Sequence, residues 1–137
     1  MRKYIITPAL LAIVCMVMCH CTFNRKASVA ANEYLIQGEL ANLPDSIVIG
    51  LYEEDGNILN CVLRDTLMNG QFSFRDTVST TRKMLIMSDN RGFPGTWLEV
   101  WIAPGEYIEI KGQDKLVKTW EVVSDVPEQQ DETHQAP

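Results

Sequence analysis

An Asn-Gly pair between two β-prone runs is the feature that most constrains the fold of this chain. Residues 62–68 read VLRDTLM and residues 71–78 read QFSFRDTV, with Asn69 and Gly70 between them. A type I′ turn needs positive φ at both central residues, and Asn-Gly is the pair that supplies it most readily. After the turn, Phe72 and Phe74 alternate with polar residues. The stretch therefore predicts a β-hairpin with one apolar face, and with it an all-β domain.

Further runs of alternating apolar and polar residues follow the same pattern. Turn-forming residues separate the runs, and Pro104-Gly105 suits the central positions of a type II turn that closes a second hairpin. Strands at such close spacing are typical of an antiparallel β-sandwich or open barrel, and we expect about eight of them in a domain over residues 34–124. The expected strands are residues 34–40, 46–52, 58–68, 71–78, 83–88, 97–103, 107–111 and 117–123.

The alternation also predicts which residues of each strand share a face. Four of the expected strands, the first, second, sixth and seventh, have a set of apolar residues on one face. The sets are Tyr34, Ile36, Gly38 and Leu40; Ile47, Ile49 and Leu51; Leu98, Val100 and Ile102; and Ile108 with Ile110.

The first 21 residues predict a signal peptide. Arg2 and Lys3 precede an apolar run over residues 5–18. This run of about 14 residues is shorter than the roughly 20 that a helix needs to cross a bilayer. A short apolar run after a charged start is typical of a secretory signal. We therefore expect an N-terminal signal helix before the β-domain, and an exported protein.

Cys19 and Cys21 stand where the apolar run ends, the place of the acylated cysteine in a bacterial lipoprotein signal. We expect acylation of Cys21, with Cys19 as the alternative, so that a lipid anchor holds the protein on the periplasmic or cell-surface side of a membrane. Cleavage after residues 28–30, a small-residue site, is a rival interpretation, and an uncleaved anchor is a third. Residues 22–33 are small and polar and predict a tether, and the acidic residues 125–137 predict a disordered tail.

Charge limits the partners of the exported part. The whole chain carries 12 basic and 18 acidic residues, a net charge of −6. Removal of the segment through Cys21 takes away Arg2 and Lys3, which leaves 10 basic against 18 acidic residues and a net charge of −8. Because nucleic acids and anionic lipid surfaces are held by Lys and Arg, we expect neither as a partner.

The residues give no catalytic or metal-binding constellation. The two histidines, His20 and His134, lie in the signal region and in the tail, so a Ser-His-Asp or Cys-His arrangement is excluded from the β-domain. The three adjacent residues 19–21 cannot all face one metal ion. Acidic residues at 53–55 are explained by a solvated turn. We expect a non-enzymatic protein without cofactor or metal.

Cys61 is the one cysteine inside the predicted β-domain. A lone exported cysteine can act as a reactive thiol or form an intermolecular bridge. A cysteine within a strand is more often a small buried apolar residue, and we expect that role here.

Trp97, Glu99 and Trp101 share one strand face, opposite the apolar face of the same strand. Exposed aromatic rings of this kind can form a platform for a peptide, a sugar or a partner domain. The alternative is that a second layer covers this face and the rings are core residues.

Several short motifs, taken in order, resemble the N-terminal β-domain of unassigned function found in lipoproteins of Bacteroides-type bacteria. The motifs are Ile36-Gln-Gly38, Asp65-Thr66, Asn69-Gly-Gln-Phe-Ser-Phe74, Ile102-Ala-Pro-Gly105, Lys118-Thr-Trp-Glu-Val-Val-Ser124 and Val126-Pro-Glu-Gln129. The resemblance covers roughly residues 34–130. In that family the domain usually precedes a thioredoxin-like module of thiol–disulfide oxidoreductases. The 137 residues contain no Cys-x-x-Cys, so this activity is not implied for them.

The same resemblance implies that three tripeptides are candidate O-glycosylation sites. Residues 45–47, 65–67 and 76–78 share the form Asp-Ser/Thr-aliphatic, which is the O-glycan acceptor pattern in exported proteins of that lineage. The candidate O-glycosylation sites are Ser46, Thr66 and Thr77.

These observations together predict a binding or accessory module of the cell envelope that acts by surface recognition of a protein partner. Two further interpretations stay open. The chain is the N-terminal piece of a thioredoxin-like oxidoreductase lipoprotein, or it is a structural component of an envelope complex.

Overall fold

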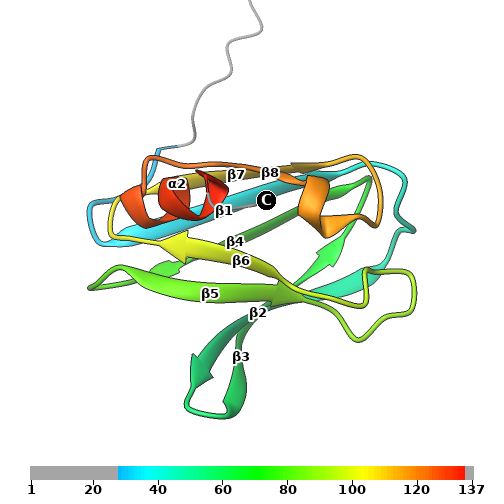
Figure 1. Ribbon diagram of the computed structural model, residues 1–137, viewed down its shortest axis with the longest axis horizontal. Coiled ribbons are helices and arrows are strands. Elements are labelled where there is room, and N and C mark those ends of the chain that lie inside the picture. The colour runs from blue at the N-terminus through cyan, green and yellow to red at the C-terminus, as the bar shows by residue number, and fades with distance from the viewer. Residues whose placement is uncertain (1–27, 135–137) are drawn as a thin grey trace, which may run out of the picture.

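The computed structural model describes residues 28–134, which form eight strands in two four-stranded sheets (Figure 1). This confirms the predicted β-sandwich. The predicted signal helix and both candidate acylation sites lie outside the described residues. The strands are β1 (Glu33–Leu40), β2 (Ile47–Asp55), β3 (Ile58–Leu67), β4 (Gln71–Thr77), β5 (Arg82–Met87), β6 (Leu98–Ile102), β7 (Tyr107–Gly112) and β8 (Glu121–Val123).

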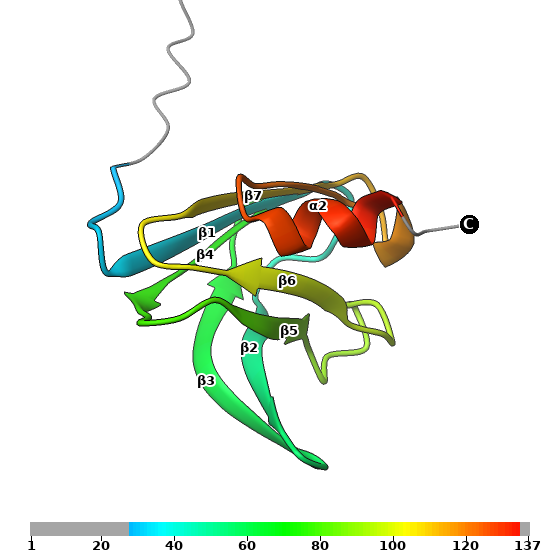
Figure 2. The ribbon, with the colours of Figure 1, turned by 60° about the vertical axis from the view of Figure 1, so that its left-hand side comes forward.

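The two sheets have the strand orders β4-β1-β7-β8 and β3-β2-β5-β6. All neighbouring strands are antiparallel except β1 and β7, which run parallel from Leu35 opposite Tyr107 to Leu40 opposite Gly112. The tip of the β2–β3 hairpin extends beyond the body of the sandwich (Figures 1 and 2).

The core lies between the two sheets and includes most of the residues of the predicted apolar faces. Ile36, Ile49, Leu51, Ile108 and Ile110 are fully buried. Removing such side chains from water is the main stabilising contribution, about 1.5–3 kcal/mol for each.

The Asn69-Gly70 turn forms as predicted, with φ of 51° and 74°, but the hairpin ladder does not follow it. One bridge, Met68 to Gln71, joins the two sides. Beyond it β3 enters one sheet and β4 enters the other. The prediction of a hairpin is therefore wrong, and the turn instead connects the two sheets. Each strand pairs within the sheet in which its apolar face covers the inner face of the opposite sheet.

The Pro-Gly turn behaves in the same way. Gly105 has φ of 79°, and the N–H of Glu106 donates to the carbonyl of Ala103 at 3.2 Å. The strands that the turn connects, β6 and β7, again belong to different sheets. The turn confirms the prediction, and the hairpin expected from it does not form.

Two departures occur near the C-terminus. The last expected strand is divided into the 3₁₀ turn η2 (Val117–Thr119) and β8. The tail predicted to be disordered contains helix α2 (Pro127–His134), which lies beside β6 (Figures 1 and 2). The prediction of disorder was wrong here because Val126 and Gln129 are 1% and 6% exposed and attach the segment to the sandwich.

Candidate functional site

The face of sheet β3-β2-β5-β6 that points away from the core carries the predicted platform. Register places Tyr52 opposite Leu85, Leu85 opposite Glu99, and Gly50 opposite Met87. Trp97 directly precedes β6, next to the pair of Leu98 and Ile86. Leu85 on this face is 6% exposed and Trp101 is half-buried, so only part of the face is open to solvent. We call it the Trp97 face, with the residues Tyr52, Leu85, Met87, Trp97, Glu99 and Trp101.

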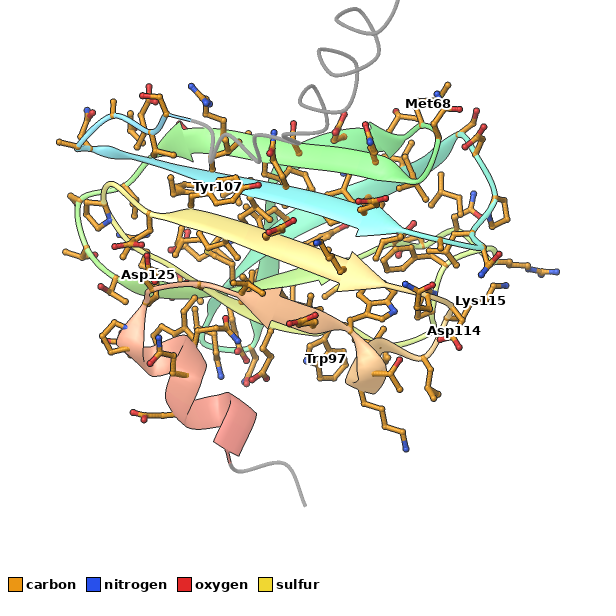
Figure 3. The ribbon with its side chains drawn as sticks, turned by 90° about the horizontal axis from the view of Figure 1, so that it is seen from above. Met68, Trp97, Tyr107, Asp114, Lys115 and Asp125 are labelled. Atoms are coloured by element: carbon orange, nitrogen blue, oxygen red, sulfur yellow. The ribbon has the colours of Figure 1, made fainter. Side chains whose placement is uncertain are left out.

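Trp97 is the most exposed aromatic side chain of this face, with 52% of its surface accessible. It lies on the α2 and β8 side of the molecule, far from Met68 on the other side (Figure 3). An exposed Trp on an open sheet face is able to bury a large apolar area against a partner.

Glu99 and Trp101 are held differently. The carboxylate of Glu99 lies 3.6 Å from the ammonium of Lys83, and both side chains are half-exposed. A solvated pair of this kind contributes little stability. Trp101 is half-buried, and its indole Nε1 is buried without a hydrogen-bond partner among the described residues. The three predicted residues share one face, and Trp97 is the accessible ring.

A hollow of about 330 Å³ opens on the same sheet, above Gly50. A Cβ atom on Gly50 would lie 2.5 Å from Cε2 of Tyr52, so the phenol ring occupies the space that a side chain at Gly50 would need. Arg64 stands on β3 directly opposite Gly50, and Asp89 with Asn90 forms the other wall.

The β2–β3 pairing has a bulge that places Cys61 beside Tyr52. The register shifts between Leu51, which faces Leu63, and Tyr52, which faces Cys61. Burial raises the pKa of the Tyr52 phenol, Cys61 and the Asp89 carboxylate raise it further, and the Arg64 guanidinium opposes them. The phenol at Tyr52 is therefore neutral at physiological pH.

Cys61 itself is half-buried rather than buried as predicted. Its thiol donates to the carbonyl of Leu63 at 3.3 Å. The bulge has turned it toward the surface, which the strand pattern could not indicate because the extra residue breaks the alternation.

A larger hollow of about 580 Å³ lies on the outer face of the other sheet. Its walls are mainly polar side chains of β1, β3, β4 and β7, and the hydroxyl of Tyr107 donates to Oε1 of Gln37 at 3.0 Å. Sequence reasoning found neither hollow. The signals were a glycine inside a strand pattern at Gly50 and polar residues at alternate positions of β1 and β4.

The three candidate O-glycosylation residues, Ser46, Thr66 and Thr77, are all exposed. The carboxylate of Asp65 accepts the backbone N–H of Thr66 at 2.8 Å, and that of Asp76 accepts the N–H of Thr77 at 2.7 Å. Accessibility is what a modifying enzyme needs, and the modification stays a prediction.

Residues 28–134 bring together no three His, Cys, Asp or Glu side chains able to hold a metal ion. No helix in this part is long and apolar enough to cross a membrane.

No protein-family model, curated protein or solved structure matches this chain. The resemblance to the lipoprotein β-domain stays a prediction.

Proposed function

We propose that this chain is a non-enzymatic, exported module of the cell envelope that docks a protein partner through the Trp97 face. The observation that carries the proposal is the exposure of Trp97, which is 52% accessible directly before β6. Trp is enriched among the residues that dominate binding energy at protein interfaces.

A lipid anchor at Cys21, or alternatively at Cys19, supplies the membrane attachment. The acidic net charge supports this choice, because a chain with more carboxylates than cations is not attracted to anionic headgroups. The anchor keeps the module at the membrane, and the Trp97 face remains free for the partner.

The docking experiment compares two variants with matched exposure. Trp97→Ala and Met68→Ala each remove a large side chain that is about half exposed, 52% and 51%, on different sides of the molecule. Proteins cross-linked to the chain in intact cells are identified for both variants and for the unchanged chain. We expect a specific partner to be lost with Trp97→Ala and kept with Met68→Ala. Equal capture by both variants would falsify the docking surface.

The family resemblance supports a second candidate. If this stretch is the N-terminal part of a thiol–disulfide oxidoreductase, the partner of the Trp97 face is a thioredoxin-like module in the same polypeptide. The intact mass of the native protein distinguishes the two, since an additional domain adds roughly 100–150 residues.

A further inference from the structure

The hollow above Gly50 has an aromatic end and two polar walls, and two charged groups of these walls form no hydrogen bond within the described residues. Among residues 28–134, the guanidinium of Arg64 and the carboxylate of Asp89 form no hydrogen bond and no ion pair. Both are exposed. Arg64 therefore offers donors from one wall and Asp89 offers acceptors from the other, and the ring of Tyr52 covers Gly50 between them.

The wall formed by residues 88–90 is fixed by its own hydrogen bonds. The hydroxyl of Ser88 donates to the carbonyl of Val48 at 2.6 Å and accepts the N–H of Asn90 at 3.1 Å. The side-chain oxygen of Asn90 accepts the N–H of Gly92 at 2.8 Å, which leaves the amide NH₂ as a donor. A wall that is ordered before binding loses little conformational freedom when a ligand arrives.

Ser46 adds backbone strain at the far end of the hollow. Its φ is 65°, a left-handed value that a non-glycine residue rarely adopts. The N–H of Ser46 donates to the carbonyl of Leu67 at 2.8 Å, which holds this conformation. Strained residues are concentrated at binding sites, and here the strain presents an exposed hydroxyl.

We propose that this hollow binds a neutral saccharide unit. A sugar ring has an apolar C–H face, which fits the ring of Tyr52. Its hydroxyls both donate and accept, which fits Arg64 and Asn90 as donors and Asp89 and Ser46 as acceptors. The volume of about 330 Å³ lies at the lower end of ligand pockets, roughly 300–1,000 Å³, and suits one or two sugar rings.

The charges of the hollow favour a neutral sugar. Arg64 and Asp89 carry opposite charges on facing walls. An anionic group that pairs with the Arg64 guanidinium is therefore repelled by the Asp89 carboxylate. The net negative charge of the chain adds a general repulsion toward acidic polysaccharides. A zwitterionic amino acid is the rival ligand, because its two charges match the two walls.

The test uses the full chain in a detergent without a sugar headgroup. Four neutral hexasaccharides, built from glucose, mannose, galactose and xylose, are titrated calorimetrically and by NMR of the backbone amides, with glycine as the zwitterionic probe. We expect at least one hexasaccharide to bind, with shifted amides at Gly50, Tyr52 and Asn90. Asp89→Ala is expected to weaken binding at least about tenfold, since it removes a charge-assisted hydrogen bond.

Glu39→Ala is the matched control, because Glu39 is an exposed acidic residue that lines the hollow on the other sheet. It is expected to leave the affinity unchanged. The proposal is overturned if no hexasaccharide binds, if Glu39→Ala weakens binding and Asp89→Ala does not, or if glycine binds at these amides in place of the sugars. The titration contains no protein partner, so its result is independent of the docking proposed for Trp97.

Discussion

The backbone N–H of Trp101 donates a hydrogen bond of 2.8 Å to the side-chain Oε1 of Gln129. Trp101 lies on β6, an edge strand of its sheet, and Gln129 lies on α2. Unpaired N–H groups of an edge strand attract strands of other chains, and natural proteins cover such edges. Helix α2 has this role for β6, and Val126, which directly precedes the helix, is 1% exposed.

Replacement of Gln129 tests this role. Gln129→Ala leaves the N–H of Trp101 without its partner and is expected to cost about 1 kcal/mol of unfolding free energy. Hydrogen exchange of the Trp101 amide should accelerate. Gln130→Ala is the control, because Gln130 is exposed and bonds only within its own segment. A change at Gln130 as large as that at Gln129 contradicts the account.

The docking of α2 also shows why composition misled the prediction for the tail. Over residues 125–137 the average is acidic and polar. Of residues 125–131, Val126 and Gln129 are buried, and the side-chain oxygen of Gln129 bonds to a strand residue that lies 28 positions earlier in sequence. An average over a segment cannot reveal two contacts with a distant strand.

Gly38, Gly50 and Gly112 are strand glycines covered by aromatic rings, and we expect alanine to be tolerated unequally at the first two. A Cβ on Gly38 would lie 2.0 Å from Cε1 of the buried Phe72, whereas the ring that Gly50 meets is half-exposed. Gly38→Ala is expected to cost about 1–3 kcal/mol, and Gly50→Ala less, because Tyr52 can turn toward solvent. Urea denaturation measures both.

Gly95 is the control for these two. A Cβ there meets nothing within 4 Å, and its φ is not positive. Gly95→Ala is expected to change stability by less than about 0.5 kcal/mol. An equal loss at all three positions would show that ring coverage is not the cause.

How much of the structure could be predicted from the sequence depends on how far apart in the chain the interacting residues lie. The positive φ values of Asn69 and Gly70 are set by the turn itself, and the alternation of Ile47, Ile49 and Leu51 is a pattern within one strand. Both could therefore be predicted from the local sequence. Whether β3 pairs with β4 is decided by which inner faces must cover each other, which is a property of the whole chain. The hollow needs Arg64 on β3 and Asp89 after β5, on either side of β2, and only the sheet order supplies that.

Stability should fall at alkaline pH because of Tyr34. Burial, with a smaller contribution from the Asp76 carboxylate, raises the pKa of the Tyr34 phenol to about 12 in the folded chain, against 10.0 normally. The neutral phenol is therefore favoured by folding. Its contribution is complete below pH 10 and is lost as the pH rises through about 12. Urea denaturation across this range should show the loss, and Tyr34→Phe should remove that part of it.

The mass of the native protein from the membrane fraction tests the modifications. We expect the chain to begin at Cys21 as a diacyl- or triacyl-cysteine, and Cys21→Ser should release it to the soluble fraction. Hexose-sized increments that disappear with Ser46→Ala, Thr66→Val or Thr77→Val would assign the glycans. A bare chain that begins at Ala31 contradicts the lipid anchor, and acylation kept in Cys21→Ser but lost in Cys19→Ser moves it to Cys19.

The two tryptophans of the Trp97 face should separate binding from packing. Trp97 is 52% exposed, so Trp97→Ala is expected to change unfolding free energy by less than about 0.5 kcal/mol. Trp101 is half-buried against the sandwich, and Trp101→Ala is expected to cost about 2–3 kcal/mol, below the full core value. Thermal unfolding measures both, and partner capture is measured on the folded Trp97→Ala variant. If Trp97→Ala also unfolds the domain, the ring is a packing residue, and the docking surface must be sought elsewhere.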